Sequence, residues 1–119
     1  MADHNWIVEL FQSIDDKNID LFSSFLAQDC VFRFGNLPAV EGADEVSKFV
    51  AAFFDSIHSL KHDISESWFQ QDAVICHGMV SYARHDQSVL TVPFSNIFRI
   101  ENDKVNDYLI FADTSQLYR

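Results

Sequence analysis

The hydrophobic period of this chain changes once, near Lys61, and that change constrains the fold more than any other feature. Before Lys61, apolar residues recur every three or four positions, as in helices that bury one face. After it, apolar and polar residues alternate, which is typical of half-buried strands. Helices first and strands afterwards predict an α+β fold.

Three helices are predicted in the first half. The clearest apolar stripe consists of Val46, Phe49, Val50, Phe53, Phe54 and Ile57. An earlier helix carries Trp6, Ile7, Leu10, Phe11 and Ile14, with Asp3 as its expected N-cap. A short helix between them is expected to begin at a capping Asn18 and to carry Leu21, Phe22, Phe25 and Leu26. A brief strand is expected over Cys30–Phe34, closed by a turn at Gly35-Asn36.

Four strands are predicted in the second half, over 62–69, 73–84, 89–100 and 105–111. Short polar segments separate them, which indicates hairpins and an antiparallel meander. The three helices must cover one face of this sheet. A curved sheet wrapped around a long helix leaves a cavity at its open end, and we expect the functional site there.

The size and charge of the chain exclude several classes of function. Its 119 residues are expected to form a single domain over 1–119. Eight basic against eighteen acidic residues give a net charge of −10, which argues against nucleic-acid or anionic-membrane binding. No apolar run approaches the about 18 residues of a membrane-spanning helix, and the first residues lack the pattern of a signal peptide. Cys30 and Cys76 have apolar neighbours and are interpreted as buried thiols, which favours a cytoplasmic location.

Several local motifs agree with this order of elements. They are Asn36-Leu37-Pro38 with Gly42, then residues 78–86, then 92–99, and finally Asp107-Tyr108 with 113–118. Together they resemble the nuclear transport factor 2-like superfamily and, within it, the SnoaL-like group. The resemblance covers essentially the whole chain. It implies a conical, cystatin-like fold with three N-terminal helices on a strongly curved, mainly antiparallel sheet. It is specific for the fold and weak for the reaction.

The resemblance also implies candidate catalytic residues. Epoxide-hydrolase-like members use Tyr-x-Asn, Arg-x-Asp and a late Asp, which match Asn36, Arg84-His85-Asp86 and Asp113, although Phe34 replaces the Tyr. Asp86 is equally well explained as a turn residue. Ketosteroid-isomerase-like members would need a base near Phe34, a Tyr near Leu10 and an Asp near Asn96, and only the amide of Asn96 is present. SnoaL-like cyclases rely on one Asp near the pocket, for which Asp113 is the best match. None of these reactions requires a cofactor or a metal.

Asp113, Arg84 and Asn96 are therefore the expected catalytic residues. Asp113 follows an apolar strand, where burial would raise the pKa of its carboxyl group, but it could equally cap the C-terminal turn. Arg84 shares a strand face with Gly78, Val80 and Tyr82 and is expected to pair with Asp113, the alternative being a head group in solvent. Asn96 shares its face with Phe94 and Phe98, so its amide serves either a ligand or a polar network.

A second set of residues is expected to line the ligand pocket: Phe34, Phe53, Tyr82, Phe94 and Phe98, with Asn36 and His62. Asn36 is also explained as a turn residue, and His62 as a hydrogen-bonded structural histidine. His58 and His62 have the i, i+4 spacing of a metal-binding pair, but the helical pattern ends near Ile57, so no metal site is expected.

The outer face of the sheet is expected to carry Val92 and Ile97, with Tyr108 and Ile110 as further candidates. Such a face is too apolar for water, which predicts a homodimer formed through the sheet. The leading hypothesis for function is a cofactor-independent acid–base enzyme, of hydrolase, cyclase or isomerase type, for a small and largely apolar molecule. The alternative is a non-catalytic module that binds a hydrophobic ligand or a protein. A third hypothesis is that Phe34 and Phe98 close the cavity and only the dimer surface matters.

Overall fold

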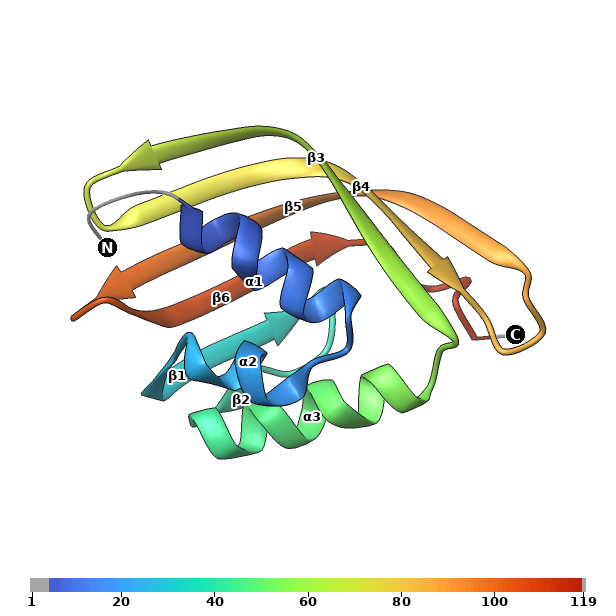
Figure 1. Ribbon diagram of the computed structural model, residues 1–119, viewed down its shortest axis with the longest axis horizontal. Helices are drawn as coiled ribbons and strands as arrows, with labels where there is room; N and C mark the ends of the chain where they lie inside the picture. The colour runs from blue at the N-terminus through green and yellow to red at the C-terminus, as the bar shows by residue number, and fades with distance from the viewer. Residues whose placement is uncertain (1–4, 119) are drawn as a thin grey trace.

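The computed structural model describes residues 5–118, so the expected N-cap Asp3 lies outside the described residues. Three helices and six strands follow one another (Figure 1) in the order α1 (Asn5–Asp15), α2 (Ile19–Ser24), β1 (Leu26–Phe34), β2 (Val40–Glu41), α3 (Ala43–Asp55), β3 (Ser59–Gln70), β4 (Ala73–Ala83), β5 (Val89–Glu101) and β6 (Lys104–Ala112). The predicted α+β fold is confirmed, because the helices precede the long strands and pack on one sheet.

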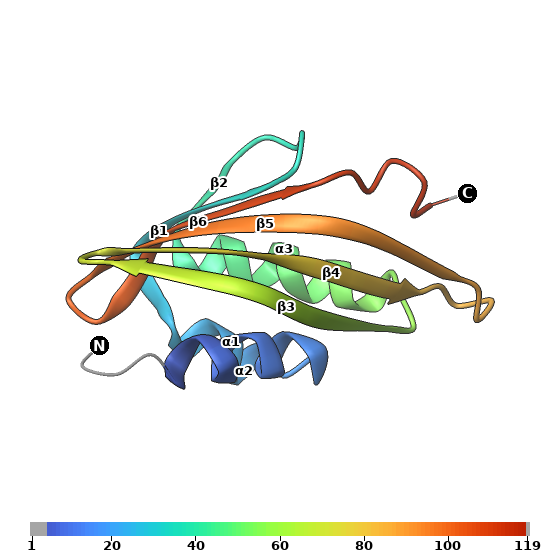
Figure 2. The same ribbon diagram turned by 90° about the horizontal axis from the view of Figure 1, so that it is seen from above.

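The strands form a curved sheet in the order β2-β1-β6-β5-β4-β3. β3 to β6 are antiparallel neighbours, as the predicted meander requires. β1 lies parallel to β6, with Phe32 opposite Tyr108, and β2 pairs antiparallel with β1. α1 packs against β3 and α3 against β1, so the helices fill the hollow of the sheet (Figures 1 and 2).

The short elements begin and end where local chemistry dictates. The Asn18 side chain accepts a hydrogen bond from the backbone N–H of Leu21, which confirms it as the N-cap of α2. α2 ends at Ser24, earlier than expected, because Phe25 is its C-cap and Leu26 already belongs to β1.

β3 approaches β4 very closely at Gly78. A Cβ atom on Gly78 would overlap the carbonyl oxygen of Asp63, and the register of β3 against β4 shifts between Ile64 and Glu66. Only glycine permits this approach. This close contact lies one residue beyond His62 in β3, so it helps to fix where that side chain enters the interior.

The alternation of the strands separates an inner from an outer face. Phe94, Asn96 and Phe98 are buried, as expected from their shared parity. The expected outer positions of Val92, Tyr108 and Ile110 are wrong, because all three pack against the core. Val92 shares the parity of Phe94 and Asn96, and Tyr108 and Ile110 of β6 lie opposite Phe98 and Asn96 on the same inner face.

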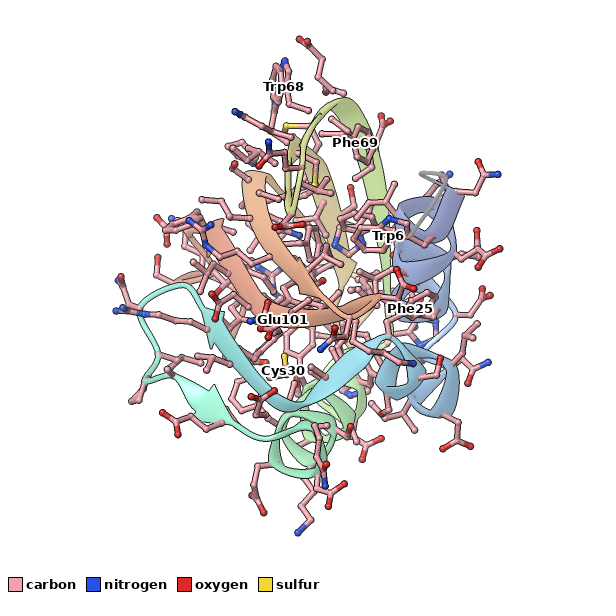
Figure 3. All side chains as sticks on the ribbon, turned by 90° about the vertical axis from the view of Figure 1, so that its left-hand side faces the viewer. Trp6, Phe25, Cys30, Trp68, Phe69 and Glu101 are labelled. Carbon is pink, nitrogen blue, oxygen red and sulfur yellow. The ribbon has the colours of Figure 1, made fainter. Side chains whose placement is uncertain are left out.

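The outer face instead carries large apolar side chains from other positions of the strands. Trp68, Ile75, Met79 and Phe111 are between 41% and 54% exposed. Trp68 stacks on the ring of His77, at a centroid distance of 5.5 Å, and Figure 3 shows it at the outer edge of the molecule while Trp6 points inward. None of the described helices is both long and apolar enough to cross a membrane.

Candidate functional site

An inner cavity lies between the helices and the concave face of the sheet. Most of its lining is apolar and aromatic, and four polar side chains interrupt it: His62, Tyr82, Asn96 and Tyr108. Its volume is about 40 Å³, room for a few water molecules. Phe34, Phe53 and Phe94 line it as expected. Phe98 belongs instead to the core, where its ring lies 4.5 Å from that of Tyr108.

The most organised polar contact at this cavity joins two elements that are far apart in the sequence. Asp15 is the last residue of α1, and its Oδ1 lies 2.7 Å from Nδ1 of His62 in β3. Its Oδ2 accepts a 3.0 Å hydrogen bond from the backbone N–H of the same His62. The His62 and Asp15 side chains are only 11% and 18% exposed. The imidazole ring is held in place by Phe11 and Phe94, at centroid distances of 4.8 and 5.2 Å.

This geometry fixes the role of each nitrogen of His62. An ionised carboxylate only accepts hydrogen bonds, so Nδ1 carries the proton of the neutral ring. Nε2 then keeps its lone pair and is the nitrogen able to take a proton from a molecule in the cavity. The carboxylate of Asp15 would stabilise the imidazolium that forms.

Asn96 provides the second polar feature of the cavity. Its side chain is 1% exposed, and its Oδ1 has no hydrogen-bond partner within the described part of the chain. A buried acceptor without a donor costs stability, so its presence here points to a partner that the protein itself does not supply.

The two tyrosines that line the cavity are kept neutral by their surroundings. Burial raises the pKa of Tyr108 well above its ordinary value, and the nearby Cys76 raises it further. Burial likewise raises the pKa of Tyr82, with a smaller effect from Tyr118. Both phenols therefore stay protonated at neutral pH and are able to donate hydrogen bonds.

Asp113 lies outside this cavity. β6 ends at Ala112, and the exposed Asp113 accepts a 3.0 Å hydrogen bond from the backbone N–H of Ser115. Hydrogen bonds from Ser115 hold the pKa of the Asp113 carboxyl below its ordinary value. The expected rise of this pKa is therefore wrong, because the side chain turns into solvent instead of following the strand into the interior.

Arg84 is engaged by the C-terminal segment. Its Nε donates to the carbonyl oxygen of Leu117 and its Nη2 to that of Gln116, both at 2.8 Å, while Nη1 donates to Oγ of Ser88 at 3.0 Å. The structure thus places Arg84 as a clamp on the last residues, and its hydrogen bonds go to these groups and not to Asp113. Asp86 accepts from the backbone N–H of Ser88, as a turn residue does.

Asn36 is also separate from the cavity. It is exposed in the turn after β1 and borders a surface groove together with Arg33 and Phe111. The turn is made by Gly35, whose φ of 56° lies in the left-handed region. Of the polar residues predicted from the sequence, the structure brings His62, Tyr82 and Asn96 to one cavity and leaves Asp113, Arg84 and Asn36 elsewhere.

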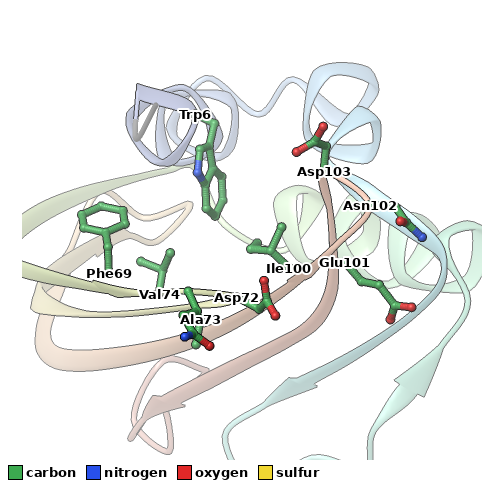
Figure 4. Close-up of a pocket in the computed structure, with 10 residues that line it drawn as sticks. Trp6, Phe69, Asp72, Ala73, Val74, Ile100, Glu101, Asn102 and Asp103 are labelled. Atoms are coloured by element: carbon green, nitrogen blue, oxygen red, sulfur yellow. The ribbon is translucent and has the colours of Figure 1, made fainter. Parts of the chain in front are cut away.

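A larger hollow opens at the other end of the sheet, where the β3–β4 and β5–β6 turns meet below Trp6 (Figure 4). Its volume is about 500 Å³, and its acidic side chains, Asp72, Glu101 and Asp103, are exposed. An open, solvent-exposed hollow does not exclude water from a bound molecule, which makes it a poorer place for proton transfer than the apolar inner cavity. Among the described residues, no group of three or more His, Cys, Asp or Glu side chains is arranged to hold a metal ion.

Comparison with known proteins gives the same fold and one family. A protein from Jannaschia sp. CCS1 that is assigned as a SnoaL-like polyketide cyclase is 18% identical, with 93% of this chain and 85% of that chain covered and a TM-score of 0.82. An LEH-like epoxide hydrolase of M. tuberculosis is 9% identical, with coverage of 92% and 80% and a TM-score of 0.80. A protein from Catenulispora acidiphila with a ketosteroid isomerase-like fold, in complex with trimethylamine, is 12% identical, with coverage of 88% and 82% and a TM-score of 0.81.

These identities are low enough that the structures show the fold alone. No functionally curated protein matches the chain. The model of the SnoaL-like domain, however, matches residues 7–108. The chain therefore belongs to the SnoaL-like domain family, as its motifs suggested.

Proposed function

We propose that this protein is an acid–base enzyme for a small, largely apolar molecule, with His62 as the proton-transferring group. The observation that supports this most directly is an imidazole fixed by a carboxylate at the wall of an apolar cavity that also holds the unpartnered Oδ1 of Asn96. His62 replaces Asp113 as the expected base, because His62 lines the cavity and Asp113 does not.

The chemistry follows from the positions of the polar atoms. Nε2 of His62 accepts a proton from a C–H or O–H group of the substrate, and the electron pair of that bond moves into the substrate. Asp15 stabilises the imidazolium, and the phenols of Tyr82 and Tyr108 donate hydrogen bonds to an oxygen that gains charge. Return of the proton to another atom gives isomerisation or cyclisation, and proton removal from a water molecule gives hydrolysis.

A base in an apolar cavity is detected without knowledge of the natural substrate. In 5-nitrobenzisoxazole, removal of the C3 proton breaks the ring N–O bond and releases a coloured cyanophenolate. We expect the wild type to accelerate this elimination and His62→Ala to lose at least about 100-fold of that rate. His58→Ala is the matched control, since His58 is exposed and lies four residues away. A wild type without activity, or equal losses in the two variants, would contradict the proposal.

A non-catalytic binding module is the second candidate function. The mainly aromatic lining of the cavity favours it, because such a lining binds by burial of apolar surface and needs no proton transfer. The same assay separates the two candidates: a binding module would hold the probe without releasing the phenolate.

We further propose that the outer face of the sheet forms a homodimer. Ile75, Met79, Trp68 and Phe111 expose apolar area from three strands of one sheet, and a second copy would remove it from water. Sedimentation is expected to show a dimer for the wild type and a monomer for the Ile75→Lys, Phe111→Lys double variant. A monomeric wild type would contradict this interface.

We also propose a cytoplasmic location. Cys30 and Cys76 are both free and buried, and burial raises the pKa of each thiol to about 12, so neither is reactive at neutral pH. Protected thiols without a disulfide suit a reducing compartment. Cell fractionation tests this, and recovery from an extracellular fraction would contradict it.

A further inference from the structure

Two spaces in this molecule share one wall. The first is the inner cavity of about 40 Å³. The second is an outer apolar groove of about 290 Å³ between α3 and residues 114–118. Phe34 and Phe53 line both spaces, and their ring centroids lie 5.1 Å apart. These two rings therefore form the partition between the groove and the polar atoms of the cavity.

We infer that Phe34 and Phe53 form a gate, and that the molecule admitted through it is a small aromatic or alicyclic alcohol. Its ring system would lie in the outer groove and in the space that the Phe53 ring vacates. Its hydroxyl group would reach Asn96. This inference rests on the cavity that the proposed function uses, and adds which molecule enters it and by which route.

The volumes require such an opening. Small-molecule sites usually measure about 300 to 1,000 Å³, so the inner cavity alone is far too small, whereas the two spaces joined reach the lower end of that range. Phe98, which one of the sequence hypotheses also placed at the closure, does not line the cavity, whereas Phe34 lines both the cavity and the groove. The groove on its far side shows that the same ring also borders a space large enough for a ligand.

The structure indicates which part of this wall is able to move. The C-terminal side of the groove is fixed, because Leu117 is 1% exposed and Arg84 binds the carbonyl oxygens of Gln116 and Leu117. Tyr118 adds a 2.7 Å hydrogen bond to Ser56. Phe53 is only half-buried and makes ring contacts without a polar tether, so a change of its rotamer breaks no hydrogen bond.

The hydrogen-bond acceptors inside the cavity are the reason why the ligand is expected to carry a hydroxyl group. Oδ1 of Asn96 lacks a donor, and Nε2 of His62 is an acceptor as long as Nδ1 donates to Asp15. A ligand that satisfies either atom must bring its own hydrogen. The described residues that line the cavity include no Lys or Arg, and the protein carries a net charge of −10, so a carboxylate or phosphate ligand is disfavoured.

The test compares 2-naphthol with 2-methoxynaphthalene, which has the same ring system but no donor. We expect the wild type to bind 2-naphthol, to shift the imidazole NMR signals of His62 on binding, and to bind the methoxy compound at least about tenfold more weakly. Phe53→Ala is expected to raise the association rate constant for 2-naphthol at least about tenfold. Phe53→Leu, which retains an apolar side chain and protects the fold, is expected to raise it less.

Phe49→Ala is the matched control, because Phe49 lines the groove and is absent from the lining of the cavity. Three results would overturn the inference: no binding of 2-naphthol to either the wild type or Phe53→Ala, equal rate increases in Phe49→Ala and Phe53→Ala, or equal affinity for the methoxy compound. The readout is binding, so it can succeed where the elimination assay fails. Failure of the proposed acid–base function can therefore be distinguished from failure of the proposed gate.

Discussion

Two groups of polar residues, an inner cluster at the cavity and an outer cluster at the C-terminal segment, differ in what their polar atoms contact. At the inner cluster, Asp15 orients His62, and the buried Oδ1 of Asn96 has no donor among the described residues. At the outer cluster, Arg84 donates to two backbone carbonyl groups and Asp113 accepts from Ser115. The outer groups hold the chain in place. The comparison teaches that chemistry is to be sought where the fold leaves a polar atom without a partner, and not merely where it places a charge.

The largest expected difference between the clusters is in proton transfer. Asp15→Asn keeps the size of the side chain but removes the charge that stabilises the His62 imidazolium. We expect the elimination rate to fall about 10- to 100-fold. Asp113→Asn, the same change at the outer cluster, is expected to alter the rate less than about twofold. Equal effects of the two substitutions would remove the distinction between the clusters.

The next effect concerns stability at the outer cluster. Arg84→Ala removes the donors of three hydrogen bonds and leaves the carbonyl groups of Gln116 and Leu117 to solvent. We expect the free energy of unfolding to fall by about 2 kcal/mol and Tm by roughly 6 °C. The control is Arg99→Ala, since Arg99 is 63% exposed and lies 3.9 Å from Asp107. A Tm that Arg84→Ala leaves unchanged would mean that the clamp contributes nothing to the fold.

A smaller effect of the opposite sign is expected for Asn96→Leu. The substitution replaces a buried amide, one atom of which is unpartnered, by an apolar side chain of similar size. We expect the free energy of unfolding to rise by about 1 kcal/mol and the binding of 2-naphthol to be lost. Asn36→Leu serves as control, because Asn36 is exposed. A fall of Tm in Asn96→Leu, seen by calorimetry, would show that the amide is a structural group.

The fold could be predicted from the sequence because buried positions recur with the period of a helix or a strand. The stripe from Val46 to Ile57 and the four alternating segments predict α3 and the meander almost to their ends. The parallel pairing of β1 with β6 and the two-residue β2 left no such pattern, since pairing between distant segments has no local period. Val92 was assigned to the outer face although it shares the parity of the buried Phe94 and Asn96, whereas Tyr108 was misplaced because a shift of one residue in strand parity reverses every side chain.

The site was accessible only in part. Asn96 and His62 were found because polar residues interrupt otherwise apolar strands. Asp15 was missed, since Asp15-Asp16-Lys17-Asn18 has the composition of an ordinary turn between two helices. Its contact with His62 spans 47 positions and depends on how α1 crosses β3, which no local pattern encodes. Asp113 was favoured because the sequence of an apolar strand followed by an aspartate is the same in both cases, whether the carboxylate points into the interior or into solvent.

The smallest predicted effect tests that last distinction directly. Hydrogen bonds from Ser115 lower the pKa of Asp113 in the folded protein, so the ionised carboxylate favours the fold. A group with a depressed folded-state pKa stabilises the fold above its unfolded pKa, and this contribution disappears as the pH falls through the folded value. Asp113→Ala is therefore expected to lower Tm slightly at pH 7, and this effect is expected to disappear at a pH below both pKa values. A higher Tm in Asp113→Ala at pH 7 would reverse the comparison, because it would reveal a carboxylate held at a cost to stability, as functional groups are.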